Sequence, residues 1–502
     1  MFSRILVANR GEIAVRIFRT CRELGIATVA VYSPADRDAL HVQQADQALA
    51  LAGSAPEDGY LDVEQIVVAA RDSGAQAIHP GYGFLAESAR LAGACRQAGL
   101  VFIGPPARVL ELAGDKLAAR RLAREAGVPP TAGTDQPLAD LAALRRQASR
   151  LGYPLLVKAA AGGVGKGMRR VDEERQLEQA LQMAAGEARA AFGDERLFLE
   201  RYRQRVHHVE VQILADDSGR LVHLFERECS IQRRHQKIIE EAPAPLLDDD
   251  LRQQLCSDAL AVARAAGYRN AGTVEFLVDE EGNYSFMEIN ARLQVEHPVT
   301  ELLTGIDLVE QQIRLAAGEP LSLAQEDIGR RGHALECRIY AEDPTRDFLP
   351  SPGTISVCEA PAGPGIRFDS GVGAGSVVPV DYDPILAKLI VHAGDRPRAA
   401  ARLARALDET CILGVSTPLE LLGDIVRSPQ FLDGDTTTDF LERHFADWRP
   451  SPRRLQVALL GWLAERLAGG ETPPPPGGDA GSGGAGDDPW RRLRRFRMGG
   501  RS

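Results

Sequence analysis

The feature that most constrains the fold is a hairpin pattern in the middle of the chain. Residues 273–278 predict a strand, and a return strand begins at Tyr284 after a turn. If the turn centres near residues 281–282, Glu275 falls opposite Glu288. Extended to Pro298, the return strand would separate polar from apolar side chains on its two faces. Its polar face then carries Glu288, Asn290, Arg292, Gln294 and Glu296.

Two interpretations fit the opposed glutamates. Like charges facing each other across two strands destabilise the pair, so a cation between the two carboxylates would explain them. Hard oxygen ligands without Cys or His favour Mg²⁺ or Mn²⁺. The alternative is a solvated hairpin face, on which opposed glutamates cost little. The hairpin alone leaves both open.

Composition bounds the class of protein. A chain of 502 residues, 44% hydrophobic and 26% charged, predicts a globular protein with about two to four lobes. Its net charge of -11 argues against a nucleic-acid binder. No apolar run reaches the length of a membrane span, and no signal peptide precedes the first strand. The seven scattered cysteines form no CxxC pair, which favours reduced thiols in the cytoplasm.

The first hundred or so residues alternate strands with helices. Residues 4–8 predict a buried strand, a helix follows to about Gly25, and residues 27–32 predict the next strand. This order, which continues to about residue 103, indicates an open α/β lobe with a parallel sheet. Residues 79–85 (His-Pro-Gly-Tyr-Gly-Phe-Leu) follow a strand's carboxyl end, where such sheets bind ligands, although a tight turn is the alternative.

A second glycine-rich segment follows a strand that ends on a lysine. Residues 153–158 predict this strand, and residues 159–168 are mostly Ala and Gly. Small residues let backbone N–H groups approach phosphate oxygens, and Lys158 and Lys166 supply charge. The segment is not a P-loop, because Gly167 follows the second lysine. The lysine at the strand end favours a nucleotide cradle over a flexible loop.

Two more segments carry unexpected charge. Residues 228–237 combine three cationic side chains with a histidine, two glutamines and a thiol. They predict either a solvated basic loop or, beside the acidic hairpin, an anion site. Arg338 lies on the apolar strand predicted over residues 332–340, so it either snorkels at a sheet edge or faces a ligand.

Together these motifs resemble biotin carboxylase, the ATP-grasp subunit or domain of biotin-dependent carboxylases. They occur in the family's order from residue 4 to about residue 446. The motifs are residues 5–14 (ILVANRGEIA), 79–85 (HPGYGFL), 233–237 (RRHQK), 288–298 (EINARLQVEHP) and 336–338 (ECR).

The resemblance implies a fold of mixed α/β and α+β class with three lobes. The N-terminal α/β domain would be followed by an ATP-grasp domain with a mobile lid, and a C-terminal α+β domain would complete the biotin site. The expected bounds are 1–112, 113–330 with the lid at about 131–203, and 331–446. Residues 447–468 predict one more helix, and residues 469–502 a disordered Gly/Pro linker with a basic tail.

The resemblance also implies the residues of each binding site. ATP would be bound by Lys116, Lys158, Gly162, Gly163, Gly165, Lys166, Gly167, Glu200, His208, Gln232, His235 and Lys237. Two Mg²⁺ or Mn²⁺ ions would lie between the ATP phosphates and Glu275, Glu288 and Asn290. Bicarbonate would be bound by Lys237, Arg292, Gln294, the backbone at Val295, and Glu296.

The implied reaction is the ATP-dependent carboxylation of biotin, which forms a C–N bond. Glu296 would remove the bicarbonate proton, and the nucleophile formed would attack the γ-phosphoryl group to give carboxyphosphate, which breaks down to CO₂ and phosphate. Positioning and cationic stabilisation, here from Lys237 and Arg292, are what phosphoryl transfer requires. Arg338 would stabilise the biotin ureido oxyanion, with Tyr82 and His235 near the ring.

The implied partners are a biotin carboxyl carrier protein or domain, a carboxyltransferase and a second copy of the chain. Carrier-bearing subunits attach biotin within Met-Lys-Met, but none of the five methionines here neighbours a lysine. Biotin must therefore come from another polypeptide or from solution. The tail fits either a stand-alone subunit with a vestigial extension or a longer subunit cut short.

Three positions depart from the family pattern. Val164 replaces a lid glycine, Arg203 stands near the adenine where an apolar residue is common, and Thr438 is more polar than expected. We expect changed ATP affinity rather than lost activity. A catalytically silent scaffold is the alternative if Val164 disables the lid. Another ATP-grasp carboxylate–amine ligase is disfavoured by Arg338 and the loop at residues 79–85.

Overall fold

A computed structural model describes residues 1–136, 141–161, 168–452 and 460. Met1–Trp448 forms one compact unit, and Arg449–Ser502 is assigned to a second. The predicted linker and tail, and most of the helix predicted over residues 447–468, lie outside the described residues.

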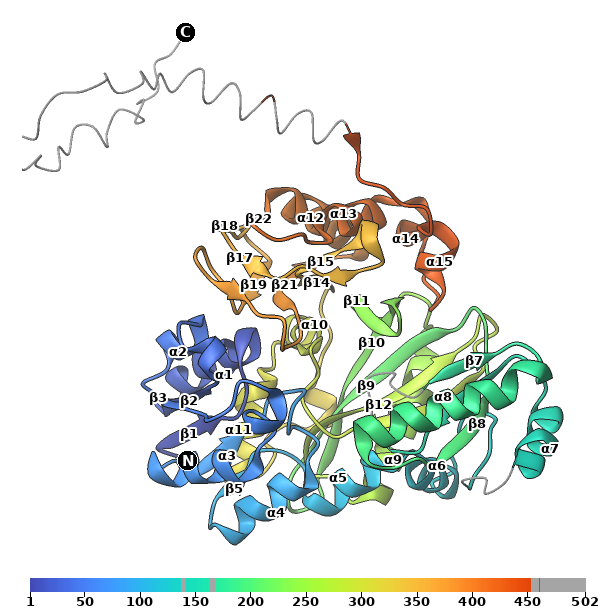
Figure 1. Ribbon diagram of the computed structural model, residues 1–502, viewed down its shortest axis with the longest axis horizontal. Coiled ribbons are helices and arrows are strands. Elements are labelled where there is room, and N and C mark those ends of the chain that lie inside the picture. The colour runs from blue at the N-terminus through green and yellow to red at the C-terminus, as the bar shows by residue number, and fades with distance from the viewer. Residues whose placement is uncertain (137–140, 162–167, 453–459, 461–502) are drawn as a thin grey trace, which may run out of the picture. The chain divides into compact units, whose positions relative to one another are not determined.

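The N-terminal lobe contains the predicted parallel sheet. Its five strands are ordered β3-β2-β1-β4-β5, and each neighbouring pair is parallel. The strands are β1 Arg4–Val7, β2 Ala27–Tyr32, β3 Gln47–Ala50, β4 Ala77–His79 and β5 Val101–Phe102. The helices are α1 Gly11–Glu23, α2 Leu40–Gln44, α3 Val63–Asp72, α4 Ala89–Gln97 and α5 Ala107–Gly114 (Figure 1). Ile5 and Leu6 belong to different hydrophobic clusters, as expected for a strand buried on both faces.

An eight-stranded antiparallel sheet, ordered β13-β12-β9-β10-β11-β14-β21-β19, positions the site. Its strands are β9 His207–Ala215, β10 Leu221–Arg233, β11 Gln236–Ala242, β12 Asn270–Val278, β13 Tyr284–Asn290, β14 His333–Tyr340, β19 Ile366–Ser370 and β21 Ile385–Ala393. Because β11 pairs with β14, the sheet is continuous across residue 330, where we expected a domain boundary.

The register of the β12–β13 hairpin depends on an irregularity. Phe276 pairs with Phe286, but Glu275 pairs with Glu288, so the register shifts between these two pairs and Met287 is the extra residue. Such bulges redirect side chains at functional sites. Without this one, Glu275 would face Met287. The predicted opposition of Glu275 and Glu288 is therefore confirmed.

The return strand is shorter than predicted. It ends at Asn290, and a loop then leads to helix α10 (His297–Thr304). Pro298 lies in the first turn of α10, where a residue without an N–H donor is well tolerated. The expectation of an extended chain to Pro298 is therefore wrong, and Glu296 occupies the N-cap position of a helix.

The segment over residues 228–237 is a hairpin whose strands are largely buried, so the solvated-loop interpretation holds only for its exposed turn. It comprises the end of β10 and the start of β11, joined by a tight turn at Arg234 and His235, whose φ angles are 47° and 65°. Cys229 and Ser230 are buried in the sheet. Arg338 is not at an edge either, because β14 lies between β11 and β21.

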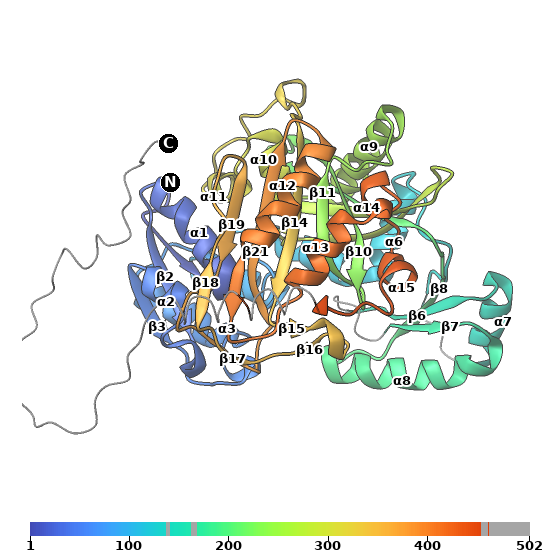
Figure 2. The same cartoon turned by 90° about the horizontal axis from the view of Figure 1, so that it is seen from above.

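A smaller sheet, ordered β7-β6-β8, carries part of the predicted lid and has its own hydrophobic cluster. Its strands are β6 Leu155–Ala159, β7 Arg169–Val171 and β8 Leu197–Arg201, with helices α7 Leu141–Leu151 and α8 Glu174–Phe192 beside them (Figures 1 and 2). Residues 162–167 of the predicted glycine-rich cradle, including Val164, lie outside the described residues.

The remaining helices cover the large sheet. Helix α12 lies over β14 and β21, α13 packs against α12, and α10 contacts the same two strands (Figure 2). Their bounds are α6 Lys116–Glu125, α9 Asp249–Ala266, α11 Leu308–Ala316, α12 Arg396–Glu409, α13 Leu419–Arg427, α14 Pro429–Asp433 and α15 Phe440–His444. Short strands complete the C-terminal region: β15 Glu342–Asp343, β16 Leu349–Pro350, β17 Gly353–Thr354, β18 Val357–Glu359, β20 Val377–Val378 and β22 Cys411–Leu413. In the described part of the chain, no helix is both long and apolar enough to span a bilayer.

Close packing around β12 predicts a large effect of one added methyl group. A Cβ at Gly272 would overlap the Tyr268 hydroxyl and lie 2.9 Å from the Asn290 carbonyl. We expect Gly272→Ala to lower the free energy of unfolding by about 1–3 kcal/mol, because a packed core resists overfilling. At Gly186, in the middle of α8, nothing lies within 4 Å of the same atom. Gly186→Ala should leave stability unchanged or raise it by about 0.5–1 kcal/mol. Equal melting temperatures for the two variants would contradict this packing.

Candidate active site

Three neighbouring strands place a row of carboxylates on the large sheet. Glu210 of β9 pairs with Glu275 of β12, which pairs with Glu288 of β13. Glu210 and Glu275 are buried, with 0% and 2% of their surfaces exposed. Such a row folds only if cations compensate it.

Lys237, on β11, supplies positive charge at the centre of these carboxylates. Its Nζ donates hydrogen bonds to Glu210 at 2.6 Å, Glu275 at 3.2 Å and Glu296 at 2.7 Å. Burial alone would lower the pKa of Lys237, but these carboxylates raise it well above its ordinary value. One ammonium therefore holds together three carboxylates from three elements.

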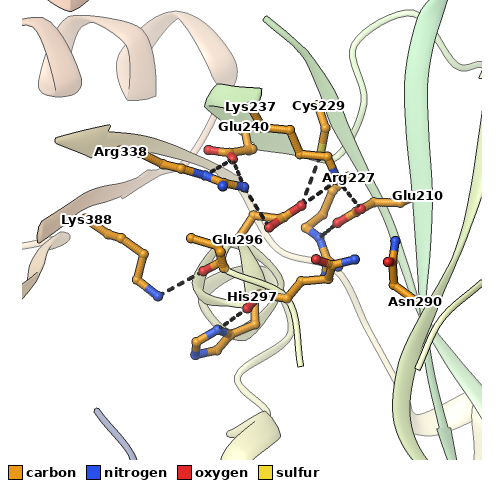
Figure 3. A network of polar contacts seen from close by, with 12 residues as sticks. Glu210, Arg227, Cys229, Lys237, Glu240, Asn290, Glu296, His297, Arg338 and Lys388 are labelled. Carbon is orange, nitrogen blue, oxygen red and sulfur yellow. Dashed lines mark hydrogen bonds and ion pairs between the residues drawn. The ribbon is translucent and has the colours of Figure 1, made fainter. Parts of the chain in front are cut away.

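Glu296 lies between cations at the centre of this network (Figure 3). Its carboxylate accepts hydrogen bonds from Lys237 and, at 2.9 Å, from Arg338 Nη2. Burial and the nearby Glu210 raise the pKa of Glu296, but Lys237 and Arg338 outweigh them, so the net shift is downward. Glu296 is therefore an ionised carboxylate at neutral pH, able to accept a proton.

Two more buried residues, Arg227 and Glu240, hold Glu210 and Arg338 in place through hydrogen bonds. Arg227, with 0% exposed surface, donates to Glu210 from Nε at 2.6 Å and to Thr300 of α10 from Nη1 at 2.9 Å. Glu240 of β11 accepts a 2.6 Å hydrogen bond from Arg338 Nε. Arg338 is thus fixed between Glu240 and Glu296, and the interpretation that it faces a ligand stays a prediction.

The loop between β13 and α10 presents further polar groups. Arg292 donates to the Gln294 side chain at 2.6 Å and to Asn290 at 3.3 Å. Gln294 in turn donates to Thr273 at 2.8 Å and to Glu275 at 3.2 Å. Four predicted bicarbonate residues (Lys237, Arg292, Gln294 and Glu296) therefore form one connected hydrogen-bond network with two predicted metal ligands, Glu275 and Asn290.

The residues predicted to hold metal fit a hard divalent cation. Glu275 accepts hydrogen bonds from His208 Nε2 and Asn290 Nδ2, both at 2.6 Å, and Glu288 pairs with Lys116 at 3.2 Å. Burial alone would raise the pKa of each carboxyl. The charges of Lys237 and His208 outweigh burial at Glu275, so the pKa of Glu275 lies well below its ordinary value. Lys116 and Lys158 outweigh burial at Glu288 and lower its pKa to about 2. Both are ionised at neutral pH, and carboxylate and amide oxygens are the donors Mg²⁺ prefers.

The predicted ATP residues converge from α6, β6 and β8. Lys158 donates to Glu200 at 2.7 Å, and Glu200 also pairs with Arg120 and accepts a 2.6 Å hydrogen bond from Thr131. Gln232 and the His208 ring lie 2.8 Å apart. Gly162, Gly163, Gly165, Lys166 and Gly167, also predicted to bind ATP, lie outside the described residues.

Tyr82 and His235 lie on two different loops. The Tyr82 carbonyl accepts a 2.7 Å hydrogen bond from Asn9, and its ring centroid lies 5.7 Å from Lys388 Nζ. His235 occupies the β10–β11 turn. Its side chain is exposed, and partial loss of hydration, followed by the charge of Lys158, lowers the pKa of His235.

Sequence reasoning missed several buried charges of this network: Glu210, Arg227, Glu240, Arg120 and Lys388. All are buried, and the first three and Lys388 lie on strands of the large sheet. The signal that singled out Arg338, a charged residue within an apolar strand, also marks Glu210 and Lys388.

Comparison with known proteins identifies the architecture. The family described as "Biotin carboxylase, N-terminal domain" matches residues 1–110, and "Biotin carboxylase C-terminal domain" matches residues 336–443. Between them, "Carbamoyl-phosphate synthase L chain, ATP binding domain" matches residues 115–324. Biotin carboxylase 2 of Bacillus subtilis is 49% identical over 88% of this chain and 100% of its own length. The chain belongs to the biotin carboxylase family.

Two other relatives support the assignment to this family. Pyruvate carboxylase 1 of Caenorhabditis elegans is 47% identical over 94% of this chain, and the match spans 41% of that longer protein. The biotin carboxylase domain of Hydrogenobacter thermophilus 2-oxoglutarate carboxylase, solved as a dimer with MgADP, ADP and bicarbonate, has 47% identity and a TM-score of 0.87, covering 88% and 98% of the two chains. The predicted family, three-domain fold class and ATP-dependent ligase class are therefore confirmed.

The described departures from the family pattern have local partners. Arg203 forms an ion pair with Asp279 at 3.3 Å, so its charge is directed to the β12–β13 turn. Thr438 uses its backbone N–H to bond Val206 at 2.9 Å. Neither interaction involves a predicted catalytic residue.

Two arginines of α6 offer a matched test of the Glu200 cluster. Arg120, with 1% exposed surface, pairs with buried Glu200, whereas Arg124 is half exposed and pairs with Asp135. Arg120→Met leaves a buried carboxylate with fewer partners and should cost about 3 kcal/mol of unfolding free energy. Arg124→Met removes a solvent-screened pair and should cost at most about 1 kcal/mol. Denaturant unfolding measures both, and comparable losses would show that the Glu200 cluster is not stabilised as described.

Proposed function

We propose that this chain carboxylates biotin, using ATP and bicarbonate, with Glu296 as the general base. The observation that carries the proposal is a buried, ionised Glu296 between Lys237 and Arg338, next to the carboxylate row. A base of this kind needs a fixed position and a pKa that keeps it unprotonated in the resting enzyme.

Bicarbonate would bind where Lys237, Arg292, Gln294 and the Val295 backbone surround Glu296. Glu296 takes the bicarbonate proton, and the dianion's oxygen attacks the γ-phosphorus of ATP, breaking the bond to ADP. Lys237 and Arg292 balance the charge that accumulates on the phosphoryl oxygens. The carboxyphosphate formed breaks down to CO₂ and phosphate.

Biotin would then react within the same site. The phosphate released takes the N1 proton, the enolate of the ureido group attacks CO₂, and Arg338 stabilises the negative oxygen. Tyr82 and His235 are proposed to lie near the biotin ring. Arg338 would thus contact both halves of the reaction, which explains why it is fixed by Glu240 as well as Glu296.

ATP would be held by Lys116, Lys158, Glu200, His208, Gln232, His235 and Lys237, together with the glycine-rich segment. Glu275, Glu288 and Asn290 are the proposed ligands of Mg²⁺ or Mn²⁺. When bound, the metal supplies positive charge that neutralises the triphosphate.

Several wider proposals follow. The biotin would be presented by a carrier protein or domain that also serves a carboxyltransferase, and the chain would dimerise, as the H. thermophilus domain does.

The domain boundaries that we propose, after residues 112 and 330, fall between the three family matches. A cytoplasmic location is supported by the seven cysteines, all described and none in a disulfide.

Substituting the base tests the function directly. Glu296→Gln keeps the shape of the side chain but cannot take a proton, so bicarbonate-dependent ADP release with biotin should fall about 100-fold or more. Glu310→Gln, on the half-exposed surface of α11, should keep wild-type turnover. Undiminished turnover in Glu296→Gln would exclude the assigned base.

The scaffold alternative predicts a different result. A silent scaffold would bind MgATP but show no biotin-stimulated turnover in the wild type, even after a biotinylated carrier domain is added. Turnover that appears only with the carrier would instead support the proposed enzyme with a strict need for its protein substrate.

The metal assignment predicts a shift in Mg²⁺ requirement. Glu288→Gln removes one charged oxygen donor, so the Mg²⁺ concentration giving half-maximal activity at fixed ATP should rise by about tenfold or more. Glu310→Gln should leave it unchanged. A normal Mg²⁺ requirement in Glu288→Gln would show that Glu288 is not a ligand.

A further inference from the structure

Lys388 is a buried cation to which neither the sequence motifs nor the proposed chemistry assigns a role. It lies on β21 directly opposite Arg338 of β14, and its side chain has 0% exposed surface. Its Nζ donates a 2.9 Å hydrogen bond to the Val295 carbonyl and lies 3.3 Å from the Glu12 carboxylate. Burying an ammonium costs several kcal/mol, so these contacts must compensate for the lost hydration.

The Val295 carbonyl belongs to the peptide unit that carries Glu296. A peptide unit is planar, so fixing this carbonyl also fixes the N–H and the Cα of Glu296. The preceding peptide unit, which holds the Val295 amide, is fixed at its Gln294 carbonyl by the His297 ring at 2.8 Å. Both peptide planes that lead to the base are therefore held by buried side chains.

Two neighbouring cations thus fix the two ends of one residue. Arg338 holds the Glu296 carboxylate, while Lys388 holds the backbone from which the side chain extends (Figure 3). Because Arg338 and Lys388 are cross-strand partners, the β14–β21 ladder sets the distance between these two contacts.

The N-terminal lobe fixes Lys388 in turn. Glu12, at the start of α1 and 1% exposed, is its ion-pair partner, and the Tyr82 ring lies beside its Nζ. Burial raises the pKa of Glu12 to about 7, and Lys388 opposes that shift. Lys388 therefore joins the α1 end of the N-terminal lobe to the loop that bears the proposed base.

We propose that Lys388 is a positioning residue for Glu296, acting through the Val295 carbonyl. The proposal rests on the proposed function, because it assumes that this loop binds bicarbonate and carries the base. It predicts that Lys388 controls bicarbonate use rather than ATP binding, since its contact is to the bicarbonate loop.

The test compares three variants. Lys388→Met removes the donor and shortens the side chain by one bond while keeping it unbranched, and kcat/KM for bicarbonate should fall about 100-fold, as expected when a catalytic group is misplaced by about 1 Å. The KM for ATP should stay within about twofold. Lys388→Gln has a side chain as long as that of Lys388→Met but keeps an N–H donor, so it should recover part of the loss. Glu12→Gln, which keeps the Lys388 bond to Val295, should lose much less than Lys388→Met.

Amide hydrogen exchange of the ligand-free protein supplies a readout that needs no activity. Exchange at residues 295–297 should speed up in Lys388→Met and much less in Glu12→Gln. If the wild type shows no bicarbonate-dependent turnover, the proposed function fails, but the exchange comparison still decides whether Lys388 holds the loop.

Two results would overturn the proposal. One is unchanged exchange and unchanged kcat/KM for bicarbonate in Lys388→Met. The other is an equal loss in Glu12→Gln and Lys388→Met, which would mean that Lys388 only joins the lobes. If Lys388→Met does not fold, the double variant Lys388→Met/Glu12→Gln is tested in its place, because it no longer leaves an unpaired buried carboxylate. The single variant Glu12→Gln is then the reference.

Discussion

The site depends on the hydrogen bonds that the Lys237 ammonium donates to three carboxylates. Glu210, Glu275 and Glu296 come from a central strand, a hairpin and a helix N-terminus, and without a shared cation they would repel one another in a buried setting. Arg227 and Arg338 balance the remaining charge from either side. The cations that compensate the buried carboxylates in the folded protein also keep Glu296 ionised. The same electrostatic interactions therefore stabilise the fold and prepare the proposed base.

The large sheet brings these groups together. Pairing of β11 with β14 joins the hairpin strands to the C-terminal strands, so Lys237, Arg338 and Lys388 approach Glu296 from one continuous framework. A rigid ladder suits groups that act within a few tenths of an ångström of one another, because hydrogen-bonded strands leave little freedom for relative displacement. The loop carrying Glu296 has no such ladder and is held by side chains instead.

The sequence predicted the parallel N-terminal sheet, the β12–β13 hairpin and the opposition of Glu275 and Glu288, because alternation and turn residues are local signals. It overestimated the return strand, since alternation of polar and apolar residues continued beyond Asn290 while Pro298 favoured a helix start. The register shift at Met287 and the partners of Lys388 could not be predicted. Both depend on contacts between distant segments: Lys388 meets Glu12 and Val295 only after the lobes assemble.

The central claim is that bicarbonate, and not water, attacks the γ-phosphorus beside Glu296. The most direct test supplies ¹⁸O-labelled bicarbonate with MgATP and biotin, and measures the isotope content of the phosphate released. Attack by bicarbonate transfers one of its oxygens to phosphorus, so each phosphate should carry one labelled oxygen in proportion to the enrichment of the bicarbonate. Phosphate without label, at a rate matching ADP release, would mean that water is the nucleophile and would contradict the account.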